Sequence, residues 1–408
     1  MMVKSVPKNW SFLEVSLGLL FALPLFPRVL RTIIIVIFGI TTIYLGITER
    51  KRFNFSNFLN GAFPYFLILM TLFLSDNLDY GVNKIQTMSP LFIFPLLFSW
   101  LDQKDILQIL TNMKTYLWVF IISVFLFNLL PFLWFWITNY EFFEAVKHFP
   151  EVIVVDIGQY SITPIYMSTL IALAILFSWK LFLNSEGIKD RIVLLFLNII
   201  LFLFLVLYAR KGVILGLFLV LAIWLFFFQQ NFKTTYKIAI LVGVTFLIFA
   251  FPQTRKRFGE MFQINENEGF VSETVSIRLI TFDSAIELIK KSPIIGYGIG
   301  DYNDILDKNN RKISTELKVT YNSHNQYLSL ILIGGIILLT SFALFIGNIF
   351  RYALIHNNII LILLLIFYAV LLFVENILER ENGVLYFSLF VNLFSLLNRH
   401  IVQNENNL

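Results

Sequence analysis

The chain has 408 residues, of which 58% are hydrophobic and only 14% are charged, whereas a soluble domain carries roughly 25% charged residues. Together with a mean hydropathy of +0.78, this composition excludes an ordinary soluble protein. The formal net charge is +5, but no stripe of alternating basic and aromatic residues accompanies it, so no nucleic-acid partner is expected. The chain has no cysteine, which excludes a thiol nucleophile, a disulfide and a cysteine-bound metal.

Long apolar runs recur along the whole chain. A membrane-spanning helix needs about 20 mostly apolar residues, and about twelve such runs are present. They lie at residues 11–27, 29–48, 56–75, 87–100, 116–138, 161–180, 192–209, 212–229, 237–252, 324–348, 358–374 and 383–398. The pattern predicts an all-α integral membrane protein, folded as a single polytopic domain over residues 1–408 and surrounded by membrane lipids.

The basic residues of the short loops predict the orientation. Loops on the side of the two termini hold about twice as many Lys and Arg residues as the opposite loops, and the more basic side faces the cytoplasm. Both termini are therefore expected in the cytoplasm. Residues 253–323 form a long polar loop between the ninth and tenth spans, and under this topology the loop faces outside.

The long loop has a predicted helical segment of its own. Between Ser272 and Lys291, apolar residues recur at alternating steps of four and three, which is the pattern of one helical face. Arg278 lies beside this apolar face. Ser292-Pro293 ends the segment, since proline cannot continue a helix. We therefore expect one helix that carries Arg278 into the loop.

A glycine run and three acidic residues follow this helix. Gly296-x-Gly298-x-Gly300 predicts a tight turn, and as a phosphate-binding signal it is weak because no βαβ unit surrounds it. Asp301, Asp304 and Asp307 recur at steps of three, which places them on one face of a short helix. A solvated helix face is favoured over a metal site, and no metal is expected.

Several of these motifs together resemble a known family. Arg278, Gly296-Tyr297-Gly298, Ser323-His324-Asn325-Gln326-Tyr327-Leu328 and Gly334-Gly335 are similar to the core motif of the O-antigen ligase and polymerase family. Tyr208-Ala209-Arg210-Lys211-Gly212 resembles the small-residue-Arg-Gly junction between two spans of that family, although Ala stands for the more usual Ser and Lys211 is inserted before the glycine. The late external loop and both ends inside match the family architecture.

The resemblance implies a fold and an activity. It implies about twelve transmembrane helices with one large, mainly helical periplasmic loop, as in the GT-C class of membrane glycosyltransferases. The implied enzyme moves a glycan from polyprenyl diphosphate to a sugar hydroxyl, at the periplasmic face of a bacterial inner membrane. A ligase that uses a lipid A-core acceptor is preferred. A polymerase that extends a growing lipid-linked glycan is the alternative, and neither needs a cofactor.

The chemistry of the side chains is consistent with this implied reaction. A donor diphosphate needs cations at the membrane surface, and the planar fork of arginine binds phosphate oxygens in pairs. Arg278 and Arg210 are therefore predicted to bind the diphosphate, with anchoring to lipid headgroups as the alternative. His324 is predicted to be the catalytic base, because a neutral imidazole can take a proton from a sugar hydroxyl. Its alternative is a cap at the start of a helix.

Secondary candidates and other function classes stay open. Glu375 and Arg380, in the polar stretch between the last two spans, could orient the acceptor, and possible further contacts are Lys211 and Asn325. A transporter or flippase of lipid-linked glycan would carry buried charges within its spans, whereas here the ionisable residues lie mostly at span ends. A metal-dependent oligosaccharyltransferase uses acidic residues in its first external loop, but residues 24–31 contain none.

Overall fold

The computed structural model describes residues 10–139, 141–155, 162–185, 187–259, 264–265, 269–270, 273–313 and 321–405. Parts of the predicted loop 253–323 therefore lie outside the described residues. Within the described residues the secondary structure is helical, apart from a short antiparallel pairing of two strands. The elements are α1 (Phe12–Phe21), η1 (Leu23–Leu25), α2 (Arg28–Thr48), α3 (Phe55–Met70), η2 (Thr71–Leu74), α4 (Leu78–Thr87), α5 (Pro90–Phe98), α6 (Gln103–Asn139), α7 (Phe142–Val155), α8 (Pro164–Leu183), α9 (Ile188–Tyr208), α10 (Lys211–Ile223), η4 (Trp224–Phe228), α11 (Thr234–Ala250), α12 (Pro252–Gly259), β1 (Ile264–Asn265), β2 (Gly269–Phe270), α13 (Glu273–Lys291), α14 (Tyr302–Ile313), α15 (Gln326–Ile355), α16 (Ile359–Val374), η5 (Ile377–Glu379) and α17 (Glu381–Glu405).

Many of these helices can cross a membrane. Among the described residues, 7 helices are long and apolar enough, and the pair α11 and α12, bent by 92°, makes an eighth if it is one span. Two further apolar helices, α1 and α16, are shorter. The structure thus confirms an all-α, multi-pass membrane protein, while the number of twelve spans stays a prediction.

Two predicted runs do not form a single long helix. The first run is divided into α1, of 10 residues, and the short η1 that contains Pro24. The fourth run begins on the last residue of α4 and continues as α5, which has 9 residues. Nine residues rise only about 14 Å along a helix, which is less than the roughly 30 Å hydrocarbon core.

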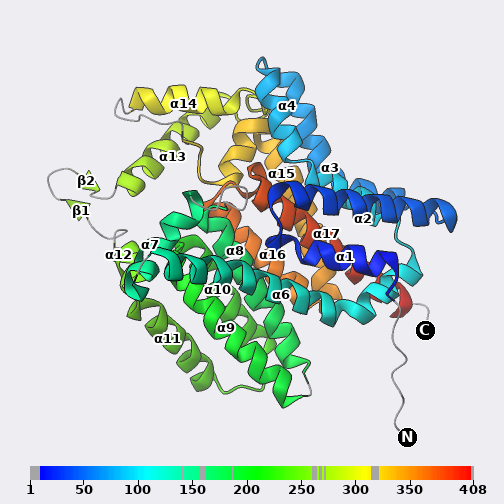
Figure 1. Ribbon diagram of the computed structural model, residues 1–408. Coiled ribbons are helices and arrows are strands. Elements are labelled where there is room, and N and C mark those ends of the chain that lie inside the picture. The colour runs from blue at the N-terminus through cyan, green and yellow to red at the C-terminus, as the bar shows by residue number, and fades with distance from the viewer. Residues whose placement is uncertain are drawn as a thin grey trace, which may run out of the picture. The chain divides into compact units, whose positions relative to one another are not determined.

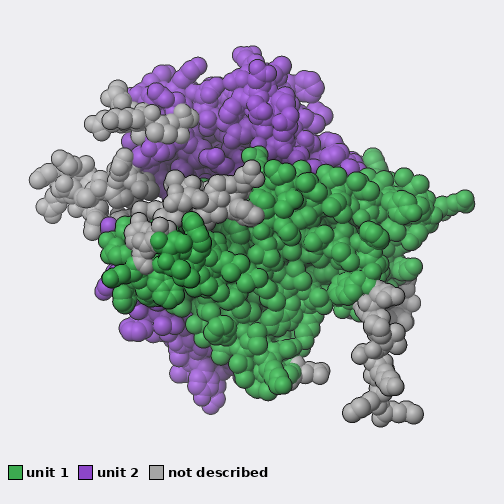
Figure 2. All heavy atoms as spheres, viewed as in Figure 1, with its two compact units in different colours: residues 1–55, 97–204 green, residues 56–96, 205–408 purple. Residues whose placement is uncertain are grey.

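The chain forms two compact units, which Figure 2 shows in green and purple. The first comprises residues 1–55 and 97–204, where the long helix α6 packs against α1 and α8. The second comprises residues 56–96 and 205–408. Within it α10 and α15 both pack on α16, and α13 packs on α14. The single polytopic domain stays a prediction, but every predicted site residue belongs to this second unit.

The predicted helix and turn of the long loop are present in the second unit. Helix α13 ends at Lys291, just before Ser292-Pro293, and α14 begins at Tyr302 after the glycine turn. The turn docks on α15, which has non-helical backbone at Gly334 and Gly335. This break frees two carbonyls of α15, those of residues 332 and 333, to accept the N–H groups of residues 297 and 298 at 2.7 and 2.9 Å. Figure 1 shows α13 and α14 beside α15 and α4.

Only glycine permits this close approach of turn and helix. A Cβ on Gly335 would lie 1.9 Å from the carbonyl oxygen of Ile294, and one on Gly296 would lie 2.6 Å from a backbone oxygen of α15. Both residues also have positive φ angles, of +66° and +67°, where glycine has no steric penalty. The Gly-x-Gly turn therefore holds the loop helices on α15, and its N–H groups at residues 297 and 298 are used for that purpose rather than for a phosphate.

Candidate functional site

His324 lies in a strained turn just before α15. Its φ angle is +46°, a left-handed conformation that costs a non-glycine residue about 1–3 kcal/mol and persists only where its surroundings impose it. The side chain of Asn322 supports the turn by accepting the N–H of His324 at 3.1 Å. The helix cap is Asn325, whose side chain accepts the N–H groups of Tyr327 and Leu328. The alternative of His324 as a helix cap is therefore wrong, because its neighbour fills that position.

Glu375 faces this imidazole from the end of α16. Its Oε2 lies 3.5 Å from Nδ1 of His324, and the two side chains are 13% and 29% exposed. Nδ1 is shielded from solvent and makes no hydrogen bond of good geometry. It faces the Glu375 carboxylate across the 3.5 Å separation. Burial raises the pKa of Glu375, but His324, the N–H of Asn376 and the charge of Arg278 outweigh burial and lower it below the ordinary value.

A close helix pair brings Arg210 toward the same place. Arg210 precedes α10, whose Gly212 and Gly216 are spaced as in the small-xxx-small motif by which membrane helices approach each other. A Cβ on Gly212 would lie 2.3 Å from a methyl of Val374, the residue before Glu375. The start of α10 therefore lies beside the end of α16, which brings Arg210 near the carboxylate.

Three arginines share this region, and we name Arg210, Arg257 and Arg278 the arginine group. Burial lowers the pKa of Arg210, the charges of Arg257 and Arg278 lower it further, and Glu375 acts in the opposite sense. The Nε of Arg210 is shielded from solvent without a hydrogen-bond partner. The side chains of Arg257 and Arg278 are exposed. The region is thus positively charged and suited to an anion with several oxygen atoms.

The structure brings His324, Arg278, Arg210 and Glu375 into one electrostatic neighbourhood, while their predicted roles stay predictions. Arg257 belongs to the basic run Arg255-Lys256-Arg257 next to a span, a pattern more typical of lipid-headgroup anchors than of substrate contacts. The bend of 92° between α11 and α12 places α12 against α10. A sequence shows the basic run but not that bend.

The remaining candidates have different surroundings. Asn325 is buried and is used by the cap of α15. Arg380 is exposed, and its charge acts on Tyr80 of α4. Lys211 is the first residue of α10 and half-buried. The proposed role of these three residues at the substrate stays a prediction.

The three aspartates of the loop serve the protein itself. Asp301 accepts the N–H groups of Asp76 and Asn77 at 2.7 and 2.8 Å, next to the start of α4. Asp304 accepts from the side chain of Asn77, and Asp307 pairs with an arginine of the same helix. Among the described residues, no group of three or more His, Asp or Glu side chains could hold a metal ion.

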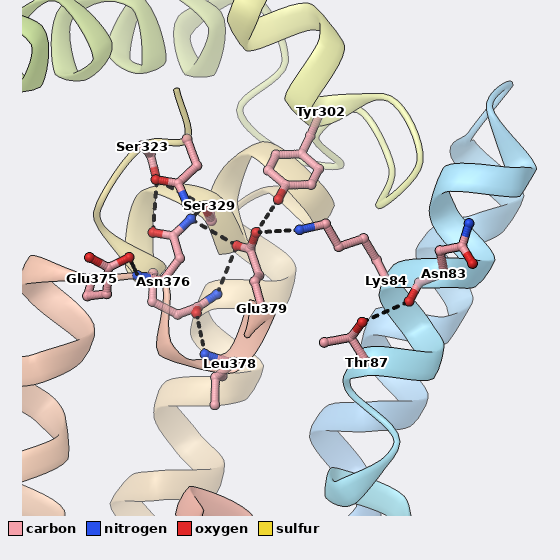
Figure 3. Close-up of polar contacts among 12 residues, drawn as sticks. Asn83, Lys84, Thr87, Tyr302, Ser323, Ser329, Glu375, Asn376, Leu378 and Glu379 are labelled. Atoms are coloured by element: carbon pink, nitrogen blue, oxygen red, sulfur yellow. Dashed lines mark hydrogen bonds and ion pairs between the residues drawn. The ribbon is translucent and has the colours of Figure 1, made fainter. Parts of the chain in front are cut away.

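A buried polar cluster adjoins the His324 turn, and sequence analysis did not single out its central residue, Glu379. Figure 3 shows the carboxylate of Glu379 among donors from α4, α14, α15 and the connection after α16. We name this set of residues the Glu379 cluster. Its members are Lys84, Tyr302, Ser323, Gln326, Ser329, Asn376 and Glu379.

The comparisons with known proteins agree with this geometry. Residues 194–343 match a family model described as O-antigen ligase. The matched segment contains Arg210, Arg257, Arg278 and His324, while Glu375 and Glu379 lie beyond it. No curated protein matches the chain.

Proposed function

We propose, starting from a chain that belongs to the O-antigen ligase and polymerase family, that it transfers a glycan from polyprenyl diphosphate to a sugar hydroxyl. Membership implies a glycosyltransferase of the ligase or polymerase type, a membrane environment and lipid-linked glycan substrates. We further propose the bacterial inner membrane as the location, with both termini in the cytoplasm and the site facing the periplasm. Support comes from the convergence of an imidazole, a carboxylate and arginines at the ends of α10, α13, α15 and α16.

His324 is proposed as the catalytic base. The carboxylate of Glu375 lies opposite Nδ1, and a carboxylate at that nitrogen favours the tautomer with its proton on Nδ1. Nε2 is then left free to accept a proton, as in the pairing of imidazole and carboxylate in hydrolases. Glu375 also stabilises the imidazolium that forms after proton transfer. Its lowered pKa supports this role, because the carboxylate stays ionised at neutral pH.

The arginine group is proposed to bind the diphosphate. The Arg210 side chain is largely removed from water and close to two like charges, and such an arrangement is stabilised by an anion. Two phosphates with several oxygens suit guanidinium forks, which bind phosphate in pairs of hydrogen bonds. Bound phosphates would offset the mutual repulsion of the arginines, so binding and charge relief occur together.

The proposed reaction is a single inverting displacement. The acceptor hydroxyl oxygen attacks the anomeric carbon while His324 takes the hydroxyl proton. The bond from that carbon to the diphosphate oxygen breaks, and polyprenyl diphosphate leaves with the bonding electrons. Fixed positive charges at the leaving group stabilise the charge that develops there, so the leaving oxygen needs no proton from an acid.

A ligase that uses a lipid A-core acceptor is the preferred assignment, and a polymerase acting on a growing lipid-linked glycan is the alternative. The base and the arginines would serve both reactions, because only the acceptor differs. A flippase of lipid-linked glycan is a further alternative. It would move the donor without breaking the bond between sugar and diphosphate, so release of free polyprenyl diphosphate distinguishes transfer from transport.

The test uses purified full-length protein in liposomes, with lipid-linked glycans extracted from cells that lack its gene. We expect His324→Gln to lower the release of polyprenyl diphosphate by about 10²–10⁴-fold, the usual contribution of a positioned base. Binding of undecaprenyl diphosphate should be unchanged. His356→Gln, at the far end of α15, is the matched control and should behave as wild type. Normal release by His324→Gln would contradict the proposed base.

A further inference from the structure

The carboxylate of Glu379 is almost fully buried and has four polar partners, of which three donate hydrogen bonds and one forms an ion pair. Its side chain is 1% exposed. Tyr302 donates its hydroxyl to Oε2, and the Nζ of Lys84 lies 3.7 Å from the same oxygen. Asn376 and Gln326 donate their amide groups to Oε1 at 3.1 and 3.4 Å. An ionised carboxylate only accepts, so these three hydrogen bonds and the ion pair with Lys84 offset the cost of burying its charge.

The four partners come from four different segments of the second unit. Lys84 belongs to α4, Tyr302 begins α14, Gln326 begins α15, and Asn376 lies in the connection between α16 and α17. Figure 3 shows Tyr302 and Lys84 reaching Glu379 from different directions. A buried charge is costly unless it is paired and hydrogen-bonded, so the carboxylate fixes all four segments where they meet.

The hydrogen bonds of the cluster continue from Glu379 to the neighbours of both His324 and Glu375. Asn376 follows Glu375 directly and donates its amide to Ser329 at 2.8 Å as well as to Glu379. The hydroxyls of Ser329 and Ser323 lie 2.9 Å apart, and Ser323 directly precedes His324. The cluster therefore holds the backbone on either side of the contact between His324 and Glu375.

We propose that Glu379 is a positioning residue for proton transfer by His324, an inference that rests on the proposed function. Glu379 acts through Asn376 and Ser323 and does not touch the reacting atoms. The left-handed turn at His324 is strained, so it keeps its shape only where contacts with the surrounding structure impose it. Without the Glu379 carboxylate, the turn relaxes and the imidazole moves relative to Glu375. A misplacement of about 1 Å can cost 10²-fold in rate.

The substitution Glu379→Gln keeps the size of the side chain but turns one acceptor into a donor. In one orientation the new NH₂ group would face the Tyr302 hydroxyl and the Lys84 ammonium. In the other orientation it would face the amide groups of Asn376 and Gln326. In either case two donors lose their acceptor. We expect kcat for release of polyprenyl diphosphate to fall about 10–100-fold. The KM for the lipid-linked donor and the Kd for undecaprenyl diphosphate should stay within about twofold of wild type, because the arginine group is unchanged.

A double-mutant cycle separates positioning from a general structural defect. If Glu379 acts through His324, then Glu379→Gln added to His324→Gln should cost no further activity, since residues acting as a unit are non-additive. Tyr302→Phe removes one donor with little change in shape and should give a smaller loss with the same non-additivity. Asp307→Asn, which changes a half-buried partner of Arg311 on α14, is the matched control and should retain wild-type kcat.

A readout independent of activity separates failure of this inference from failure of the proposed function. Diethyl pyrocarbonate modifies the imidazole, and peptide mass spectrometry follows the rate at His324 alone. We expect Glu379→Gln to change that rate by about threefold or more, because the imidazole moves when the turn relaxes, and Asp307→Asn to leave it unchanged. An inactive wild type would overturn the proposed function. Wild-type kcat in Glu379→Gln, multiplicative losses in the cycle, or an unchanged labelling rate would overturn the positioning role.

Discussion

The Glu379 cluster and the arginine group both adjoin His324 and Glu375, and they are built on opposite principles. In the cluster, a buried carboxylate is matched by donors from four segments. In the arginine group, like charges lie near one another, and Arg210 has a solvent-shielded Nε without a hydrogen-bond partner. A matched polar cluster holds a structure together, whereas an excess of like charge favours the arrival of an ion of opposite charge.

This contrast separates stability from function. Removing a cluster residue leaves buried groups without partners, which costs about 1–3 kcal/mol for each group. Removing an arginine relieves repulsion. The lowered pKa of Arg210 means that the fold disfavours its charged form, so loss of that charge should not weaken the fold. Substitutions in the Glu379 cluster should therefore lower the free energy of unfolding, whereas substitutions in the arginine group should leave it unchanged or raise it. Both kinds of substitution should lower activity.

The largest expected effect is at Arg278. Arg278→Ala should reduce release of polyprenyl diphosphate by about 10³-fold or more, comparable to the loss of an arginine that stabilises phosphate charge elsewhere. Arg278→Lys should recover little, because lysine keeps the charge but loses the planar fork. Unfolding in detergent should occur at an unchanged or higher temperature. Competition by inorganic pyrophosphate against undecaprenyl diphosphate measures the binding loss.

Arg311→Ala is the control for Arg278, since Arg311 lies on the neighbouring helix α14 and makes a local ion pair. It should keep both activity and binding. If Arg278→Ala keeps near-normal activity, Arg278 is a surface anchor and the diphosphate assignment is wrong for it. Lower thermal stability in Arg278→Ala would contradict the proposed difference in stability effects between the arginine group and the Glu379 cluster.

A smaller loss is expected at Glu375. Glu375→Gln should lower kcat about 10²-fold, less than the roughly 10⁴-fold of a buried triad aspartate, because the contact with His324 is 3.5 Å long. Binding of undecaprenyl diphosphate should change little. A kcat equal to that of wild type would show that the carboxylate does not orient the imidazole.

The pH profile of Glu375→Gln gives an independent check. The pKa of Glu375 is lowered in the folded protein. The stability that its charge gives is therefore fully present above the ordinary pKa of about 4.3. This stability is lost as the pH falls through the folded pKa, which lies below that value. Glutamine carries no ionisable carboxyl, so the loss of thermal stability on acidification through this range should be smaller in Glu375→Gln than in wild type. An equal loss in both proteins would contradict the contact.

The sequence predicted the parts of this site that depend on local pattern. The alternating steps of four and three predicted α13 with Arg278, and proline predicted its end. The glycine turn was predicted as a turn, but its docking into the break at Gly334 and Gly335 depends on carbonyls that only the folded helix presents. His324 was predicted to precede a span, and α15 does begin immediately after it.

The parts that were missed depend on long-range contacts. Glu379 was visible as one acid of a polar stretch, yet three of its four partners lie more than 50 residues away in the sequence. Its burial could not be derived from spacing. Gly212 was read as part of a junction motif, while its packing on Val374 explains why a glycine stands there. The lengths of α1 and α5 were overestimated, because apolar runs interrupted by turns have the same composition as continuous helices.

The smallest expected effect is at Asn325, which caps the helix that carries part of the Glu379 cluster. Its substitution leaves the Glu379 carboxylate unchanged. Its side chain caps α15 with hydrogen bonds of 2.9 and 3.2 Å, and replacing an asparagine cap by alanine costs about 1 kcal/mol. Asn325→Ala should lower the unfolding temperature in detergent, whereas Asn325→Asp keeps an acceptor and favours the helix dipole, so it should be as stable as wild type. Both should bind undecaprenyl diphosphate normally. A binding loss in Asn325→Asp would move this residue from the scaffold to the substrate.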